Sequence, residues 1–364
     1  MNIDSFISRF SGMTESYKFY NGEVELCYYP KEHEYFLLKD GEFILQDGVT
    51  KVVHIIDKSE ALIPWGCKMM AEKIIKNAPV IDLPTGEKIV QLPVEAFEKL
   101  IVEGKSAHKE NLKEASDIGK MAHDWIEQYI KAVLSDNEER KLELLAKFPN
   151  NEKARNCCIA ALDWMQKHNV RWVCTEHKIY SRKHQYAGTM DGLCKVDSCD
   201  DTLCCPNHFK DRLSIVDWKS SNKLYIEYLY QTAAYQAAYS EEFGTDIHDR
   251  WVIRLGKDNG DFDPWHVEAD EFDQDFEGFL TALKLTRSVR NVKERMKVRM
   301  DLIKTELKHR DKQEKEEAMR IRCPKADYYK GNRKSKCLED GTQCDACRDI
   351  YEQKQYAKLA PQNI

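Results

Sequence analysis

Gly188-Thr189-Met190-Asp191 and Asp217-Trp218-Lys219 are the two stretches that decide the fold. Each lies in an alternating run of the kind that forms a strand, and a third such run precedes them; the three cover residues 171–180, 186–196 and 212–219. Because strand side chains alternate between faces, Asp217 and Lys219 project together and Trp218 projects oppositely. If the three runs pair as neighbours, we expect Glu176, Asp191 and Asp217 to meet at one end of a sheet.

Three clustered carboxylates repel one another strongly. At ~4 Å and an effective dielectric of about 20, each pair costs roughly 4 kcal/mol, so the pKa values rise or a cation sits between the groups. Oxygen ligands suit Mg²⁺ or Mn²⁺ better than zinc, and such an ion can polarise a phosphate oxygen and activate a water. The pattern therefore predicts a metal-dependent phosphodiesterase acting on nucleic acid.

Two further side-chain groups support this site. Lys219, beside the acids, is placed to orient the attacking water or to stabilise charge on the transition state. Gln231 and Tyr235 are four residues apart in a predicted helix, 224–243, so they share one face and can hold a backbone phosphate or a metal-bound water.

The ordered set of motifs resembles the PD-(D/E)XK nuclease superfamily, in its RecB-like exonuclease branch, over about residues 48–240. Glu176, Asp191, the Asp217/Lys219 pair and the Gln231/Tyr235 pair each match a position of its pattern. Gly119, His123 and Glu127 match its helical Gly-xxx-His-xxx-Glu motif. The resemblance implies a restriction-endonuclease-like core and DNA as substrate. It also implies that His123 contacts the metal or the scissile phosphate, beside a backbone carbonyl near Trp218.

The expected fold class is α/β, a mixed sheet flanked by helices, with a β-meander before it and a helical, Cys-rich extension after it. The predicted divisions are an N-terminal meander at 1–58, a nuclease core at 59–270 with a Cys-rich insertion at 194–211, a charged helical arm at 271–322, and a Cys-rich module and tail at 323–364. Turn dipeptides such as Asn21-Gly22, Asp40-Gly41 and Asp47-Gly48 indicate the meander.

The chain has 364 residues, a formal net charge of −6 and 13 cysteines. The negative charge argues against a protein that coats nucleic acid indiscriminately. No basic segment followed by an apolar run opens the sequence, and no apolar stretch of ~18 residues occurs, so we expect no membrane contact and a cytoplasmic location, in the host cell if a phage encodes the chain. A disulfide framework is not expected there.

Cysteines cluster in two places. Cys199, Cys204, Cys205 and His208 can hold a zinc ion that staples a hairpin extension, with plain free thiols as the alternative. Cys323, Cys337, Cys344 and Cys347 lie in a polar segment that could hardly fold unaided, and four thiolates suit zinc or a [4Fe–4S] cluster, with four reduced surface cysteines as the alternative. Cys67 is a candidate N-terminal ligand if the cluster follows the arrangement seen in several RecB-like nucleases.

Three functions stay open at this point. An exonuclease of phage recombination or replication, working with proteins of those processes, is the first expectation. A defence-system endonuclease on the same fold is the second, because fold and metal site do not decide where cleavage occurs. A non-catalytic nucleic-acid-binding subunit is the third. Residues 284–322 carry 14 Lys/Arg against 7 Asp/Glu, which fits either a helix that follows phosphates or a solvated charged helix.

Overall fold

The computed structural model describes residues 3–10, 14–56, 58–197 and 211–322. The chain divides into two compact units, Met1–Thr286 and Arg287–Ile364. The first unit contains all the described strands, and the second, in its described part, is the continuation of the long helix α9 (Phe272–Arg322).

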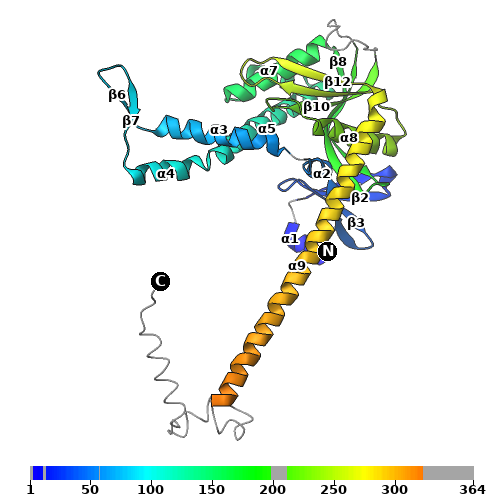
Figure 1. Ribbon diagram of the computed structural model, residues 1–364. Helices are drawn as coiled ribbons and strands as arrows, with labels where there is room; N and C mark the ends of the chain where they lie inside the picture. Colours follow the sequence, from blue (N-terminus) through cyan, green and yellow to red (C-terminus); the bar gives the residue numbers. More distant parts are fainter. Residues whose placement is uncertain (1–2, 11–13, 57, 198–210, 323–364) are drawn as a thin grey trace. The chain divides into compact units, whose positions relative to one another are not determined.

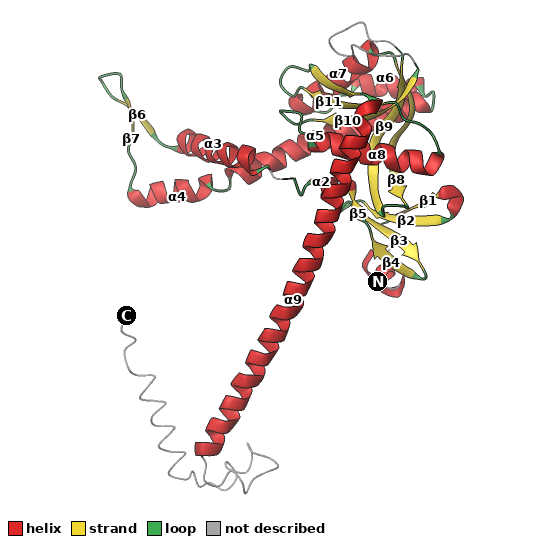
Figure 2. Cartoon of the chain, turned by 45° about the vertical axis from the view of Figure 1, so that its right-hand side comes forward, coloured by secondary structure: helices red, strands yellow, loops and turns green. Residues whose placement is uncertain are grey.

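The N-terminal segment folds as the predicted meander (Figure 2). After α1 (Ile3–Phe10), a four-stranded antiparallel sheet runs in chain order through β1 (Glu15–Phe19), β2 (Val24–Tyr29), β3 (Glu34–Lys39) and β4 (Glu42–Leu45), with a 3₁₀ turn, η1 (Tyr20–Gly22), between the first two strands. Phe6 and Phe10 of α1 pack on Phe36 and Phe43, so the helix covers one face of this sheet.

The prediction that the meander continues to residue 58, with Asp47-Gly48 as a turn, is wrong. Asp47–Gly48 forms β5, which pairs in parallel with β9 of the main sheet, and α2 (Val49–Val53) follows at once. Val49, Val52 and Val53 are spaced like one helical face and are buried in the main core. Burial of those side chains, each stabilising by roughly 1.5–3 kcal/mol, overrides the local turn signal.

The main sheet confirms the three predicted neighbouring strands. Its order is β12-β11-β10-β9-β5, with β8 also paired to β9; the new strands are β8 (Val170–Ser181), β9 (Tyr186–Val196), β10 (Arg212–Lys219), β11 (Asp249–Leu255) and β12 (Phe262–Val267). Pairing is antiparallel except for β10 with β11 and β5 with β9. The α/β class with a mixed sheet is therefore confirmed.

Helices cover both faces of this sheet (Figure 1). On one face, α5 (Ala107–Leu134) and α7 (Glu152–Lys167) bury a cluster that includes Trp164, Trp218 and Trp251. On the other face, α2, α8 (Glu227–Phe243) and the first turns of α9, with Phe279, pack over Met190 and Ile215. The odd and even positions of β10 thus enter different cores, as the strand alternation predicts.

Several elements were not predicted from the sequence. They are α1, a two-stranded hairpin of β6 (Val80–Asp82) and β7 (Lys88–Val90), α4 (Val94–Gly104), α6 (Glu138–Ala146) and a 3₁₀ turn, η2 (Ala269–Glu271). The chain becomes helical at Ser59, where α3 (Ser59–Asn77) begins. None of the described helices is long and apolar enough to cross a membrane.

The Cys-rich insertion begins later than predicted. Cys194 lies inside β9, where it is fully buried and pairs with both Trp172 and Ser214. β9 and β10 stay paired up to Val196 and Arg212, and Arg171 forms ion pairs with Asp197 and Asp211 beyond that pair. Asp191 and Asp217 therefore lie on two strands with ordinary antiparallel pairing, and residues 198–210 between these strands lie outside the described part of the chain.

Candidate metal centre

The strand register places three carboxylates in one row. Thr175 stands opposite Gly192 and His177 opposite Met190, which leaves Glu176 opposite Asp191. On the other side of β9, Val216 stands opposite Gly192, so Asp217 is level with Asp191. Opposite residues of antiparallel strands point to the same face and lie about 4.5–5.5 Å apart at Cβ.

The row lies where β9 and β10 separate. Their last paired residues are Gly192 and Val216, while at the other end of β9 the partner on that edge is β5. Asp191 fills the gap with its side chain: its Oδ2 accepts a hydrogen bond of 2.8 Å from the backbone N–H of Trp218. The carboxylate thus takes the place of the next main-chain hydrogen bond between the two strands, and it stays partly exposed.

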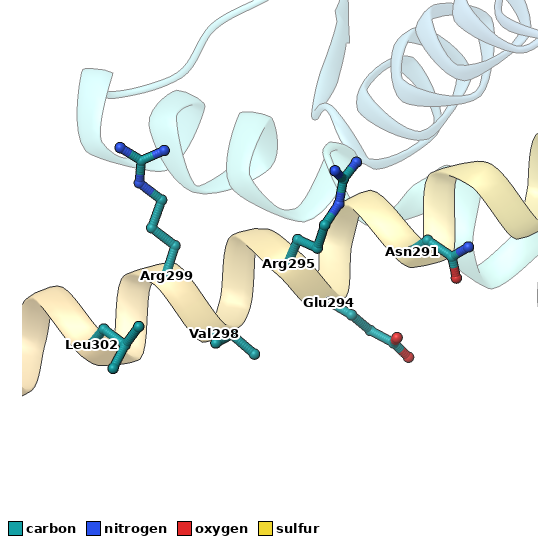
Figure 3. Close-up of a pocket in the computed structure, with 6 residues that line it drawn as sticks. All are labelled: Asn291, Glu294, Arg295, Val298, Arg299 and Leu302. Atoms are coloured by element: carbon teal, nitrogen blue, oxygen red, sulfur yellow. The ribbon is translucent and has the colours of Figure 1, made fainter.

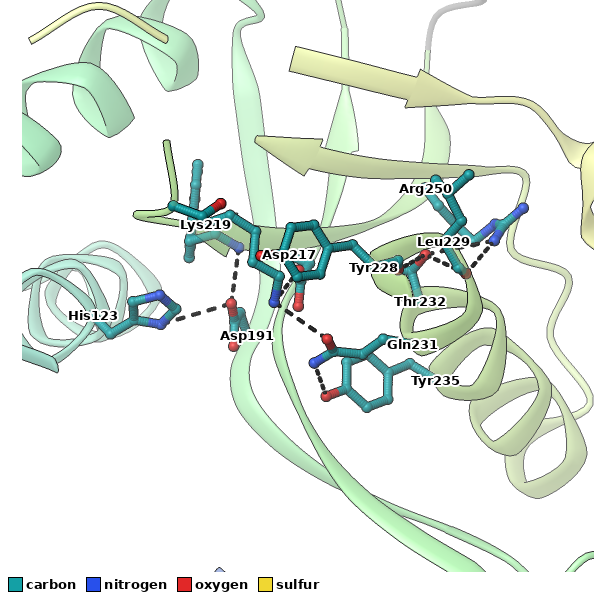
Figure 4. A network of polar contacts seen from close by, with 12 residues as sticks. His123, Asp191, Asp217, Lys219, Tyr228, Leu229, Gln231, Thr232, Tyr235 and Arg250 are labelled. Atoms are coloured by element: carbon teal, nitrogen blue, oxygen red, sulfur yellow. Dashed lines mark hydrogen bonds and ion pairs between the residues drawn. The ribbon is translucent and has the colours of Figure 1, made fainter. Parts of the chain in front are cut away.

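His123 of α5 completes a group of three potential metal ligands. One ligand atom from each of His123, Glu176 and Asp191 lies within 4.8 Å of the others. His123 Nδ1 is 3.7 Å from Asp191 Oδ2, as Figure 4 shows. Asp217 is not a member of this three-residue group; it lies behind it, almost fully buried.

Gly119, one turn before His123, explains how α5 comes so close. A Cβ at position 119 would lie 2.7 Å from the hydroxyl oxygen of Ser220, the residue after Lys219. Only a glycine lets the helix backbone approach the end of β10 without moving that serine. Glu127, the third member of the helical motif, forms an ion pair with Lys131 and is outside the ligand group.

Glu176 carries the clearest electrostatic signal. Burial, reinforced by the negative charge of Asp191, raises the pKa of its carboxyl to about 8 from the ordinary 4.5. Its backbone has φ of +49°, an unusual value for a residue within a strand. A strained backbone and a destabilised carboxylate at one residue are typical of a functional site rather than of a residue that stabilises the fold.

Asp217 and Lys219 form a buried pair. Lys219 Nζ is 2.5 Å from Asp217 Oδ2, while Asp217 Oδ1 accepts no hydrogen bond from any described residue. Burial raises the pKa of Asp217 to about 6. Burial lowers the pKa of Lys219, but the carboxylates of Asp217 and Asp191 outweigh that effect, so its pKa lies above the ordinary value and the lysine is a cation.

The predicted helix pair also meets the site (Figure 4). Lys219 Nζ donates to Gln231 Oε1 at 3.3 Å, and Gln231 Nε2 donates to Tyr235 Oη at 2.7 Å. Gly188 lies within β9, as its alternating run predicts; a Cβ there would come 2.8 Å from the ring of Tyr235. The glycine of the Gly-x-x-Asp motif therefore allows β9 and α8 to pack closely.

Sequence reasoning missed the aromatic neighbours of the site. Tyr228 presents its ring to Lys219 Nζ at 4.7 Å. Tyr35 of the meander shares a hydrogen bond of 2.8 Å with Thr189, and Tyr28 stacks beside it, 4.6 Å from the ammonium of Lys178. Tyr228 sits three residues before Gln231 and was recoverable from helical spacing, whereas no local signal connects the meander to β9.

The donor set fits a divalent cation. Two carboxylates and one imidazole lie close to one another, Asp217 lies beside them with an unsatisfied oxygen, and burial together with the charge of Asp191 raises the pKa of Glu176. The group can therefore hold a metal ion.

The two predicted cysteine sites lie outside the described residues. This applies to Cys199, Cys204, Cys205 and His208, and to Cys323, Cys337, Cys344 and Cys347. Cys67 is exposed on α3 as a free thiol.

Comparison with protein-family models finds no match to the chain, and comparison with curated proteins finds none either.

Proposed function

We propose that this chain is a metal-dependent nuclease that hydrolyses DNA phosphodiester bonds on a restriction-endonuclease-like core, as an exonuclease of phage recombination or replication in the host cytoplasm. The observation that carries the proposal is the row of Glu176, Asp191 and Asp217 across three adjacent strands, with the Lys219 ammonium against Asp217. A structural ion pair needs no third carboxylate and no strained Glu176 beside it.

Mg²⁺ or Mn²⁺ is the proposed cofactor. Glu176 and Asp191 would hold it, with Asp217 as a further oxygen ligand and His123 as the nitrogen neighbour. When bound, the ion would lower the pKa of a coordinated water and neutralise charge on the phosphate. An imidazole in the set favours Mn²⁺ over Mg²⁺ when both are offered, because Mg²⁺ keeps to oxygen ligands.

Lys219 would act as a fixed positive charge. In the metal-free protein, burial lowers its pKa, but the charges of Asp217 and Asp191 raise it above the ordinary value, so the side chain carries a positive charge there. An ammonium at this place can orient the attacking water through a hydrogen bond and stabilise the extra negative charge of the transition state. Gln231 holds the ammonium from the α8 side, and Tyr235 holds Gln231.

The decisive experiment is digestion of end-labelled linear duplex, covalently closed circular and single-stranded DNA with purified protein. We expect degradation of linear DNA that requires Mn²⁺ or Mg²⁺ and stops with EDTA. Asp217→Asn and Lys219→Met should each lower the rate at least ~100-fold, the usual scale for loss of a transition-state contact. Asp163→Asn, an exposed carboxylate of α7 paired with Lys167, is the matched control.

The outcomes separate the competing functions. Cleavage of closed circular DNA would replace the exonuclease with an endonuclease. DNA binding without cleavage by a folded protein that binds Mn²⁺ would indicate the non-catalytic subunit. Full activity in both Asp217→Asn and Lys219→Met would refute the site itself.

A further inference from the structure

α9 presents an exposed apolar stripe that the core does not use. Its members are Leu285, Val289, Val292, Met296, Met300, Ile303 and Leu307. Apart from the half-buried Val289, these side chains are 40–61% exposed. At 100° per residue the seven positions fall within about 80° of one another, so they form one narrow line about 33 Å long.

The spacing of the stripe has an unusual symmetry. From Met296 the apolar positions lie 4, 7 and 11 residues toward the N-terminus and the same 4, 7 and 11 residues toward the C-terminus. A repeat of 11 residues, about 3.67 per turn, keeps such a line almost straight along a helix. A stripe that reads the same in both directions is what a two-fold contact between identical antiparallel helices requires, because each residue then meets its mirror position.

We propose that α9 pairs antiparallel with α9 of a second copy of this chain, with Met296 on the two-fold axis. Leu285 then faces the partner's Leu307, Val289 the partner's Ile303, and Val292 the partner's Met300. The inference uses no residue of the metal centre, so it stands or falls independently of the proposed nuclease function.

Charge selects the antiparallel orientation. Residues 284–291 carry three cations and no acid, whereas residues 301–308 carry two cations and two acids. An antiparallel pair places the first segment against the second, while a parallel pair places the cationic segment 284–291 against its own copy. Long-range repulsion is therefore smaller in the antiparallel pair.

The centre of the pair remains cationic. Lys293, Arg295, Lys297 and Arg299 flank Met296, and none of them has an acidic partner among the described residues. In the dimer they approach their copies, so association must strengthen as salt screens them. Binding of a nucleic acid to the same cations would weaken with salt, so the salt dependence distinguishes nucleic-acid binding from dimerisation.

Between residues 285 and 307, the opposite face of α9 lacks such a stripe. Figure 3 shows Val298 and Leu302 there beside Glu294, with Arg295 and Arg299 projecting from the helix. The hollow at these residues is lined by α9 alone, so it encloses no ligand. Val298 and Leu302 are each 60% exposed, against 40% for Val292 and 54% for Met300, so they provide control positions on the same helix that are no more buried than the stripe.

The size of the contact suits a reversible dimer. A buried apolar side chain removes about 60–120 Å² from water, and half-exposed ones roughly half of that, so fourteen side chains bury about 400–800 Å² of apolar surface. With the flanking groups the total approaches the ~1,200 Å² lower limit of stable interfaces. We therefore expect a dimer that dissociates on dilution.

The test is sedimentation equilibrium of the full-length, nucleic-acid-free chain in EDTA. We expect a monomer–dimer equilibrium whose dissociation constant falls as salt rises from about 0.1 M to about 0.5 M. Val292→Glu and Met300→Lys should each raise that constant at least about tenfold. The double variant Val292→Glu/Met300→Lys should restore dimerisation, because the carboxylate introduced in one copy then meets the ammonium introduced in the other; a parallel pair predicts no rescue.

Two controls complete the design. Val298→Glu and Leu302→Lys should leave the dissociation constant unchanged, and all variants should keep the wild-type far-ultraviolet circular dichroism. Under mild oxidation Met296→Cys should give a covalent dimer above the wild-type background, and Val298→Cys should not. A monomer at every concentration and salt, or single stripe variants that still dimerise, would overturn the pairing.

Discussion

Asp191 Oδ2 accepts a hydrogen bond from the backbone N–H of Trp218 at the point where β9 and β10 cease to pair. The carboxylate of Asp191 thus has two roles. It connects β9 to β10 where the two strands separate, and it faces Glu176 and His123 in the ligand group. A side chain fixed through the backbone loses little further conformational freedom when an ion binds, which is the condition for a preorganised metal centre.

The two roles of Asp191 can be separated by substitution. Asp191→Asn keeps an acceptor for Trp218 N–H and removes the repulsion with Glu176, so the metal-free protein should be at least as stable as the wild type. Asp191→Ala leaves that N–H without its partner and should be less stable than Asp191→Asn by about 1–3 kcal/mol. Urea unfolding in EDTA measures this difference. Equal stability of the two variants would mean that the hydrogen bond contributes nothing.

The stability of the metal-free protein should depend on pH in a defined direction. The folded state raises the pKa of Glu176 from 4.5 to about 8 and that of Asp217 from 3.8 to about 6. The folded state therefore holds more protons than the unfolded state across this window, and the free energy of unfolding falls as pH rises from about 4 to about 8.

A bound divalent ion offsets the negative charges that lower the free energy of unfolding at high pH. Mn²⁺ favours the ionised carboxylates, so it should raise the melting temperature more at pH 8 than at pH 6. Glu176→Gln should flatten the upper part of the EDTA profile and abolish most of the metal-dependent gain. Calorimetric melting curves with EDTA and with Mn²⁺ provide the measurement, and a metal-free profile that rises toward pH 8 would contradict the assignment.

A buried ion pair away from the metal centre ties α8 and α9 to the sheet. Arg250 is 1% exposed; it donates to Asp275 at 2.7 Å and to the carbonyl of Leu229 at 3.0 Å. Asp275→Ala should destabilise the protein by about 3–5 kcal/mol, because a charged guanidinium is left unpaired. The double variant Arg250→Met/Asp275→Leu should recover most of that loss in chemical denaturation; recovery below about 1 kcal/mol would show that packing, not the stranded charge, is responsible.

The carboxylate row could be predicted from sequence because it depends on local rules. Strand alternation places Asp217 and Lys219 on one face, and consecutive strands that pair bring Glu176, Asp191 and Asp217 level. Helical spacing likewise joins Gln231 to Tyr235. Each of these inferences needs only the period of an element and the order of its neighbours.

Other features of the site depend on contacts between distant segments. β5 pairs with β9 although its Asp-Gly dipeptide favours a turn, because the three valines of α2 gain more from burial. Nothing local indicates the positive φ of Glu176 or the contact of Tyr35 with Thr189. These are tertiary effects, and they decide how the predicted residues are held rather than which residues they are.

The approach of α5 to β10 at Gly119 yields the last prediction. Gly119→Ala adds a Cβ that meets the hydroxyl of Ser220 at 2.7 Å, so either the serine turns or the helix withdraws with His123. Because His123 is one turn farther along, we expect the affinity for Mn²⁺ to fall about tenfold while the fold is kept, in line with the effect of losing a supporting contact around a metal.

Matched variants test whether the loss of Mn²⁺ affinity in Gly119→Ala comes from the clash with Ser220. Ser220→Ala removes the clashing oxygen, and the remaining Ser220 Cβ distance is 3.8 Å, so Gly119→Ala/Ser220→Ala should regain the wild-type affinity. Gly66→Ala on α3, where an added Cβ meets nothing within 4 Å, should leave it unchanged. Isothermal titration with Mn²⁺ measures all four proteins. If the double variant binds as weakly as Gly119→Ala, the helix approach does not position His123.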